Sequence, residues 1–118
     1  MGLDSFFKIK KYSTPEWKKL NVKLCGGLFS GEGADYSFRG KVYNDLVQQV
    51  TGISLYSFEI SNCDLIKMSN KLQETKYDIK WGAINKYPYD ITKQEYADIK
   101  KIFKIAAETE NCVLVGWW

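Results

Sequence analysis

Apolar residues recur at helical spacing in three segments of the chain. Ser61 and Asp64 have the spacing of a capped helix start ahead of one segment. Thr92 and Glu95 form a capping box ahead of the last segment. Gly52 directly follows the first segment and is a typical helix stop signal. We therefore predict helices over about 41–51, 63–74 and 92–108. The residues expected to face the core are Val42, Leu46 and Val50, then Leu65, Met68 and Leu72, then Tyr96, Ile99, Phe103 and Ala106.

Strand-like segments alternate with these helices. Three of them, rich in β-branched and aromatic residues, are Leu3–Lys10, Ile53–Ile60 and Cys112–Trp118, and Asn21–Cys25 alternates briefly. Thr14 before Pro15 indicates a further short helix, whereas 76–88 fits either a short strand or an ordered loop. We predict the α+β (or α/β) class, with one domain over 1–118 and three to four helices packed on one mixed β-sheet.

The amino-acid composition excludes several kinds of catalytic and metal site. The chain has 118 residues, 45% of them hydrophobic and none of them histidine, which removes Ser-His-Asp sites and every zinc site that contains histidine. The three cysteines lack the paired spacing of a metal site, and neither a signal peptide nor a membrane span is visible. Any catalysis would have to use carboxylates, lysine, tyrosine or a hard metal bound by oxygen ligands. We expect a cytoplasmic protein and name no catalytic residue, no metal and no cofactor. The net charge of +3 does not favour a nucleic-acid partner.

Five of the nine glycines fall within residues 26–40. Gly26 and Gly31 match the outer glycines of a phosphate loop, but Glu32 stands where that loop needs lysine. Gly31 and Gly33 begin a dinucleotide-binding pattern, but Tyr36 stands where its third glycine belongs. Two interpretations remain open: backbone N–H groups that hold an anion ahead of a helix, or a tight connection or bulged hairpin.

Arg39 is the only arginine beside sixteen lysines, and it lies between the glycines and the helix expected at about 41. Its planar fork of donors suits phosphate, and the alternative is a salt bridge to Asp4, Asp35 or Asp45. An aromatic ring such as Tyr36, Tyr43 or Trp117 is expected to stack on a base. The predicted ligand-binding residues are Gly26, Gly27, Ser30, Gly31, Gly33, Tyr36, Ser37, Arg39, Lys41 and Tyr43.

Aromatic residues make up 15% of the chain. Trp117 and Trp118 at its end are predicted to lie in an oligomer interface, with a docked terminal strand as the alternative. A second cluster, among lysines, resembles a stacking platform for single strands and consists of Tyr77, Trp81, Tyr87 and Tyr89.

Four segments together resemble a group of small uncharacterised proteins of bacteriophages and bacteria: the MGLDSF start, LCGGLFSG, SFRGKVY and the GWW end. The resemblance implies an accessory protein that acts by binding in the cytoplasm of a bacterial host. We expect a non-enzymatic, homo-oligomeric protein that binds a phosphate-bearing ligand, for example a cyclic or adenine-based immune signalling nucleotide. The alternatives are an inhibitor that binds a host protein and a metal-dependent phosphoester hydrolase.

Overall fold

A five-stranded antiparallel sheet forms one layer of the molecule. The computed structural model describes residues 4–8, 23–24, 27–28, 30–32, 35–77, 91–109 and 111–117. In spatial order the strands are β4 (Ser30–Glu32), β5 (Asp35–Phe38), β1 (Asp4–Lys8), β7 (Val113–Trp117) and β6 (Glu59–Ile60). The β1 strand thus lies in the middle of the sheet and pairs with β5 and β7, which are distant from each other in sequence.

The register of the sheet places buried residues side by side. Phe7 of β1 pairs with Leu114 of β7, and Leu114 pairs with Ile60 of β6. Because directly paired residues share a face, these three side chains form one apolar row. All three are at most 3% exposed.

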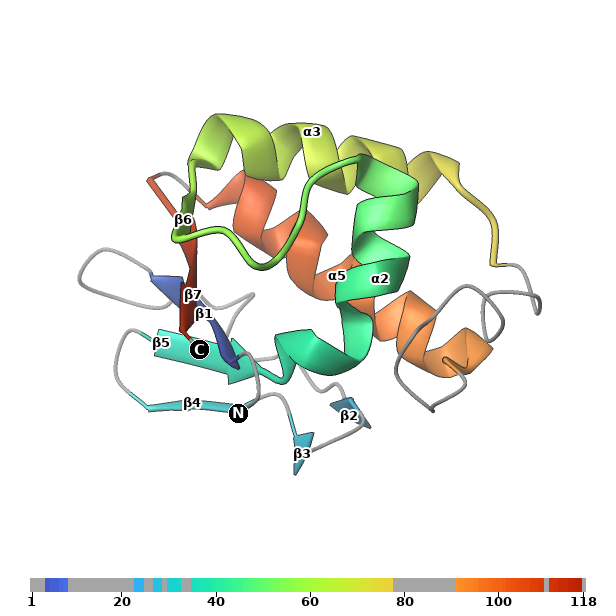
Figure 1. The fold of residues 1–118 in the computed structure, drawn as a ribbon, viewed down its shortest axis with the longest axis horizontal. Coiled ribbons are helices and arrows are strands. Elements are labelled where there is room, and N and C mark those ends of the chain that lie inside the picture. The colour runs from blue at the N-terminus through green and yellow to red at the C-terminus, as the bar shows by residue number, and fades with distance from the viewer. Residues whose placement is uncertain are drawn as a thin grey trace.

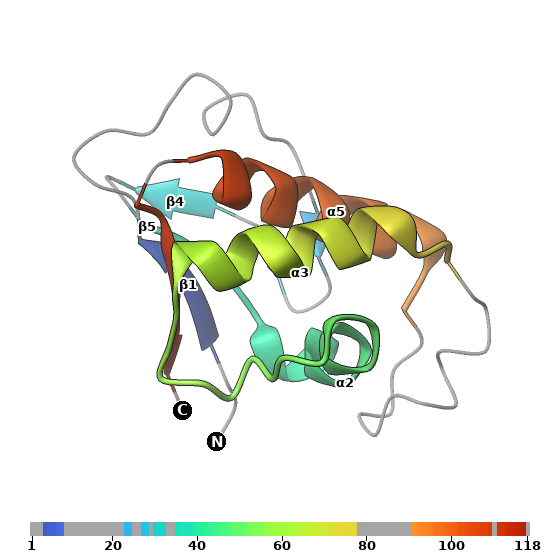
Figure 2. The ribbon, with the colours of Figure 1, turned by 90° about the horizontal axis from the view of Figure 1, so that it is seen from above.

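Three helices among the described residues cover that face of the sheet (Figures 1 and 2). They are α2 (Gly40–Thr51), α3 (Asn62–Glu74) and α5 (Lys93–Glu108). The α3 and α5 helices run side by side, and α2 crosses them, so that it is seen end-on in Figure 2. None of the described helices is both long and apolar enough to cross a bilayer.

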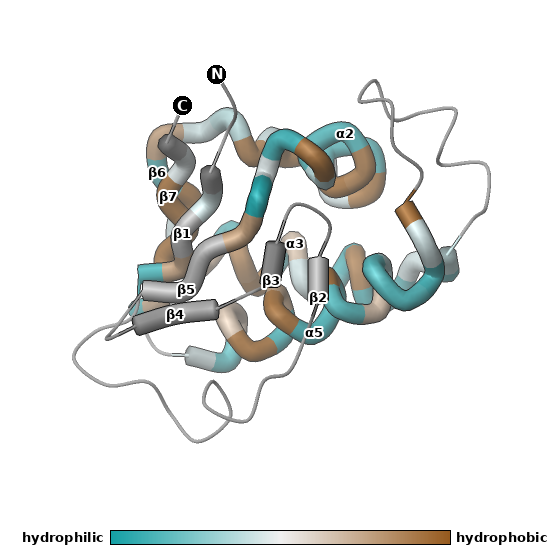
Figure 3. The backbone as a smooth tube through the Cα atoms, turned by 90° about the horizontal axis from the view of Figure 1, so that it is seen from below, coloured by the Kyte–Doolittle hydropathy of each residue, from teal (hydrophilic) through white to brown (hydrophobic). Residues whose placement is uncertain are grey.

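Aromatic rings join the helical layer to the sheet. Phe103 of α5 meets Phe7 edge-on with ring centroids 5.6 Å apart, and it lies 6.3 Å from Phe38 of β5. Hydrophobic positions recur between hydrophilic ones along the helices in Figure 3, as expected for helices with one buried face. The core residues predicted on α3 and α5 are all buried.

The predicted combination of helices with a β-sheet is confirmed, as are the helices over 41–51, 63–74 and 92–108 and the first and last strands. Every described strand pair is antiparallel, so the mixed sheet that we predicted is not what this part of the chain shows. A second, two-stranded sheet pairs β2 (Lys23–Leu24) with β3 (Gly27–Leu28). The short helix predicted at Thr14 and most of 76–88 lie outside the described residues.

The strand predicted over Ile53–Ile60 is wrong for all but its last two residues. Side chains hold the backbone there in a bent path. The Asn44 Oδ1 atom accepts hydrogen bonds from the Leu55 N–H at 2.7 Å and from Ser54 Oγ at 3.2 Å. Ser54 Oγ in turn accepts one from the Tyr56 N–H at 3.0 Å. Such local bonds replace a strand ladder, because each N–H donates only once.

Gly52 ends α2 in the left-handed conformation, with φ of 79°, and its N–H donates to the Gln48 carbonyl. A side chain strains this backbone even though no atom lies within 4 Å of the Cβ position. We expect Gly52→Ala to lower the free energy of unfolding by about 1 kcal/mol. Urea denaturation measures the loss in the free energy of unfolding. Gly52→Asn is the control, and its loss is expected to be smaller, because asparagine adopts the left-handed conformation more readily than alanine. Equal stability of Gly52→Ala and the parent would contradict the strain.

Candidate functional site

The glycine-rich segment forms antiparallel strands. Lys23 pairs with Leu28 and Leu24 with Gly27, which leaves two residues between β2 and β3. Glu32 pairs with Asp35, so that two residues also separate β4 from β5. This pattern fits the hairpin interpretation of the glycines. Of the predicted ligand-binding residues, Gly27, Ser30, Gly31, Tyr36 and Ser37 are strand residues, whereas Gly26 and Gly33 lie outside the described part.

Arg39 stands at the junction of β5 and α2. It is the N-cap residue of α2 in an extended conformation, its side chain is exposed, and the first turn of the helix holds no acid. No described side chain forms an ion pair with Arg39, which argues against the salt bridge to Asp45. Lys41 is half-buried in the first turn. The predicted anion site at this junction stays a prediction.

Tyr43 is a core residue, and its predicted role as a ring that stacks on a base is wrong. Its side chain is fully buried, so that no ring face is open to a ligand. The Tyr43 hydroxyl donates a 2.7 Å hydrogen bond to Glu95 Oε2 on α5. This bond joins the first turn of α2 to the first turn of α5.

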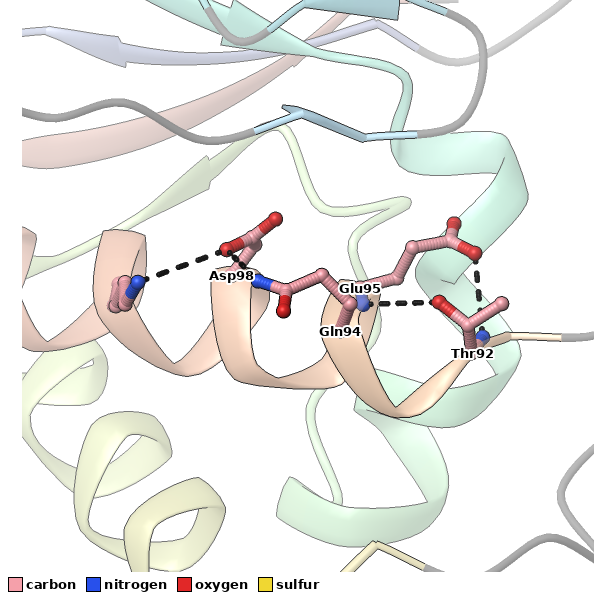
Figure 4. Close-up of polar contacts among 5 residues, drawn as sticks. Thr92, Gln94, Glu95 and Asp98 are labelled. Atoms are coloured by element: carbon pink, nitrogen blue, oxygen red, sulfur yellow. Dashed lines mark hydrogen bonds and ion pairs between the residues drawn. The ribbon is translucent and has the colours of Figure 1, made fainter.

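The start of α5 is fixed by its capping box (Figure 4). The Glu95 N–H donates to Thr92 Oγ1 at 3.1 Å, and the Thr92 N–H donates to Glu95 Oε1 at 3.2 Å. Glu95 is therefore a buried carboxylate held by hydrogen bonds from its own turn and from Tyr43. One turn further along, the buried Asp98 accepts a hydrogen bond from Gln94 and pairs with Lys101 at 3.9 Å.

A hollow of about 380 Å³ opens where the end of α3 meets the start of α5. We call it the lysine hollow. Its described lining combines three lysines, two tyrosines and one alanine and consists of Lys76, Tyr77, Lys93, Tyr96, Ala97 and Lys100. No carboxylate belongs to this described lining.

Tyrosine hydroxyls hold the two sides of the lysine hollow together. Tyr96 Oη lies 2.8 Å from the Leu72 carbonyl oxygen and 2.6 Å from that of Thr75, where it donates to the last turn of α3. The Tyr77 hydroxyl donates to the Ile91 carbonyl at 2.7 Å. Burial raises the pKa of Tyr96 to about 12, so that its hydroxyl stays protonated at neutral pH.

The lysines approach the hollow from both sides. Lys93 is the first residue of α5, and Lys100 lies on the same face two turns later. The Lys100 ammonium is 5.3 Å from the centre of the Tyr96 ring, within cation–π distance. Lys76 comes from the segment that follows α3. Three cations therefore surround one concave, partly aromatic surface.

The sequence signal for this site was present but ambiguous. Lys93, Tyr96 and Lys100 have the spacing of one helical face, which is equally typical of a solvated surface. Tyr77 was predicted in a stacking platform with Trp81, Tyr87 and Tyr89. Tyr77 lines the lysine hollow, whereas the other three lie outside the described residues.

The remaining candidates lie elsewhere. Trp117 is the last residue of β7, paired with Asp4 of β1, and Trp118 is outside the described part. Among the described residues, no three acidic, cysteine or histidine side chains gather as metal ligands. No protein-family model, curated protein or solved structure matches this chain.

Proposed function

We propose that this chain is a non-enzymatic binding protein for a phosphate-bearing ligand, and that the lysine hollow holds the phosphate. The observation that carries the proposal is the placement of Lys76, Lys93 and Lys100 around one hollow whose described lining has no carboxylate. This keeps the ligand class expected from the sequence and moves the site away from the glycine-rich segment.

Like charges that share a concave site repel one another, and an anion bound among them converts that repulsion into attraction. Lysine ammonium groups bind phosphate as point charges, each with three donors. A phosphate group therefore fits the hollow better than a neutral or cationic ligand does.

A protein that binds a ligand tightly without converting it lowers the free concentration of that ligand. An immune signalling nucleotide in the cytoplasm of a bacterial host is the kind of target that the resemblance to phage proteins supports. Arg39 and Lys41 at the start of α2 are the alternative position for such a ligand, because Arg39 is exposed there.

A thermal-shift panel tests the ligand class. A ligand present at 100 times its dissociation constant adds about 2.7 kcal/mol to the free energy of unfolding. That gain raises the melting temperature of a domain of this size by several degrees. We expect pyrophosphate and nucleotides to raise it, and the matching nucleosides at equal concentration to leave it unchanged. Equal shifts with nucleosides, or no shift with any phosphate compound, would reject phosphate binding.

A second candidate function is the blocking of a host protein, and exposed apolar side chains favour it. Phe58 is 79% exposed and Tyr56 is 43% exposed, directly before the edge strand β6. Large aromatic side chains of this kind often anchor protein interfaces. A purified host partner that binds the parent and not Phe58→Ala would favour this function, and equal binding by both would count against it.

A further inference from the structure

The lysine hollow is larger than one phosphate group requires. Its volume of about 380 Å³ corresponds to about a dozen water molecules at roughly 30 Å³ each. Pockets for small organic ligands begin at about 300 Å³. A ligand that fills the hollow therefore carries an organic part beside its phosphate.

The charges of the hollow indicate more than one phosphate. A terminal phosphate carries about −1.5 to −2 at neutral pH, and a second phosphate in the chain adds roughly one further negative charge. Two linked phosphates therefore balance the ammonium groups of Lys76, Lys93 and Lys100, whereas one leaves an uncompensated cation.

The spacing of the lysines leads to the same ligand class. Lys93 and Lys100 are seven residues apart on α5, which is about 10 Å along the helix axis. Lys76 belongs to a different part of the chain, the segment that follows α3. A chain of two or three phosphates reaches ammonium groups spread in this way more readily than a single phosphate does.

The rest of the lining suits an aromatic base. Tyr77 is half-buried, and its ring centre lies 6.3 Å from that of Tyr96, which is 2% exposed. Ala97 lies between Tyr96 and Lys100 on α5 and contributes only a methyl group to the wall. An aromatic base bound in the hollow would therefore lie beside tyrosine rings.

We infer, on the basis of the proposed function, that the lysine hollow binds a nucleoside di- or triphosphate. The phosphate chain contacts Lys76, Lys93 and Lys100, and the base lies against Tyr77. Cyclic oligonucleotides fit less well, since several linked nucleotides exceed the volume of the hollow.

Isothermal titration with phosphate, pyrophosphate, ADP and a cyclic triadenylate tests this inference. We expect ADP to bind about tenfold more tightly than pyrophosphate, because stacking adds to the affinity. Phosphate and the cyclic triadenylate should bind more weakly than ADP. In Ala97→Leu, which narrows the hollow but keeps all three lysines, the advantage of ADP over pyrophosphate should disappear while pyrophosphate binding persists.

Each outcome has a distinct meaning. Equal affinities for ADP and pyrophosphate in the parent protein would overturn the nucleotide inference and leave phosphate binding standing. Tighter binding of the cyclic triadenylate than of ADP would also overturn it. Failure of all four compounds to bind would overturn the inference and the proposed function together. The comparison in the parent protein decides the inference even if Ala97→Leu does not fold.

Discussion

Phe103→Ala is expected to lower the free energy of unfolding by about 3–5 kcal/mol. The Phe103 ring is fully buried and contacts Phe7 of β1 and Phe38 of β5, with centroid distances of 5.6 Å and 6.3 Å. Its removal leaves a cavity between the helices and the sheet and breaks both aromatic contacts. Urea denaturation followed by far-ultraviolet circular dichroism measures the loss.

Phe58→Ala is the matched control, because the same atoms are removed from a side chain that is 79% exposed. It is expected to change the free energy of unfolding by less than about 0.5 kcal/mol. Similar losses in both variants would contradict the arrangement in which α5 packs on β1 and β5.

Joint replacement of Lys93 and Lys100 by glutamine is expected to weaken pyrophosphate binding at least about tenfold, or about 1.4 kcal/mol. Both residues line the lysine hollow, and Lys100 is the more buried of the two. The remaining affinity should also fall less steeply with added salt, because fewer charges attract the ligand. Titration calorimetry at two salt concentrations measures both effects.

Two controls identify the site in that experiment. Lys104→Gln removes a charge from an exposed position of α5 outside the described lining of the hollow, and it should bind like the parent. Arg39→Ala should do the same if the ligand binds in the hollow. Without ligand, the protein with Lys93→Gln and Lys100→Gln should stay folded, since neither side chain is part of the buried core. A tenfold loss in Arg39→Ala alone would return the site to the start of α2.

Local signals predicted the helices well. The capping box of Thr92 and Glu95 and the cap of Ser61 specify helix starts through contacts within one turn, and the structure has both. Gly52 likewise ends α2 through its own backbone conformation. Information of this kind lies within a few residues of the element and can be read from the sequence alone.

The features that the sequence did not predict depend on contacts between residues that are distant in the sequence. The segment Ile53–Phe58 has the composition of a strand, yet the Leu55 N–H donates its hydrogen bond to the side chain of Asn44 and not to a neighbouring strand. Tyr43 was expected to face a ligand, yet its hydroxyl donates to Glu95, 52 residues away. Neither partner can be identified from spacing, because both depend on how α2 packs against other elements.

The lysine hollow shows the same limit. Its residues come from 76–77 and 93–100, and the two stretches meet because the Tyr96 hydroxyl donates to the end of α3 and the Tyr77 hydroxyl donates to Ile91. A tyrosine hydroxyl that bonds to a backbone carbonyl leaves no trace in sequence periodicity. The glycines of 26–40, which were the stronger sequence signal, are in part residues of antiparallel strands.

The measurement that most directly tests phosphate binding in the lysine hollow is a titration of the ¹⁵N-labelled protein with pyrophosphate, followed by amide chemical shifts. We predict saturable shifts that centre on the amides of Lys76, Tyr77, Lys93, Ala97 and Lys100. Shifts centred on Arg39 and Lys41, or none at concentrations up to the millimolar range, would contradict the assignment of the phosphate site to this hollow.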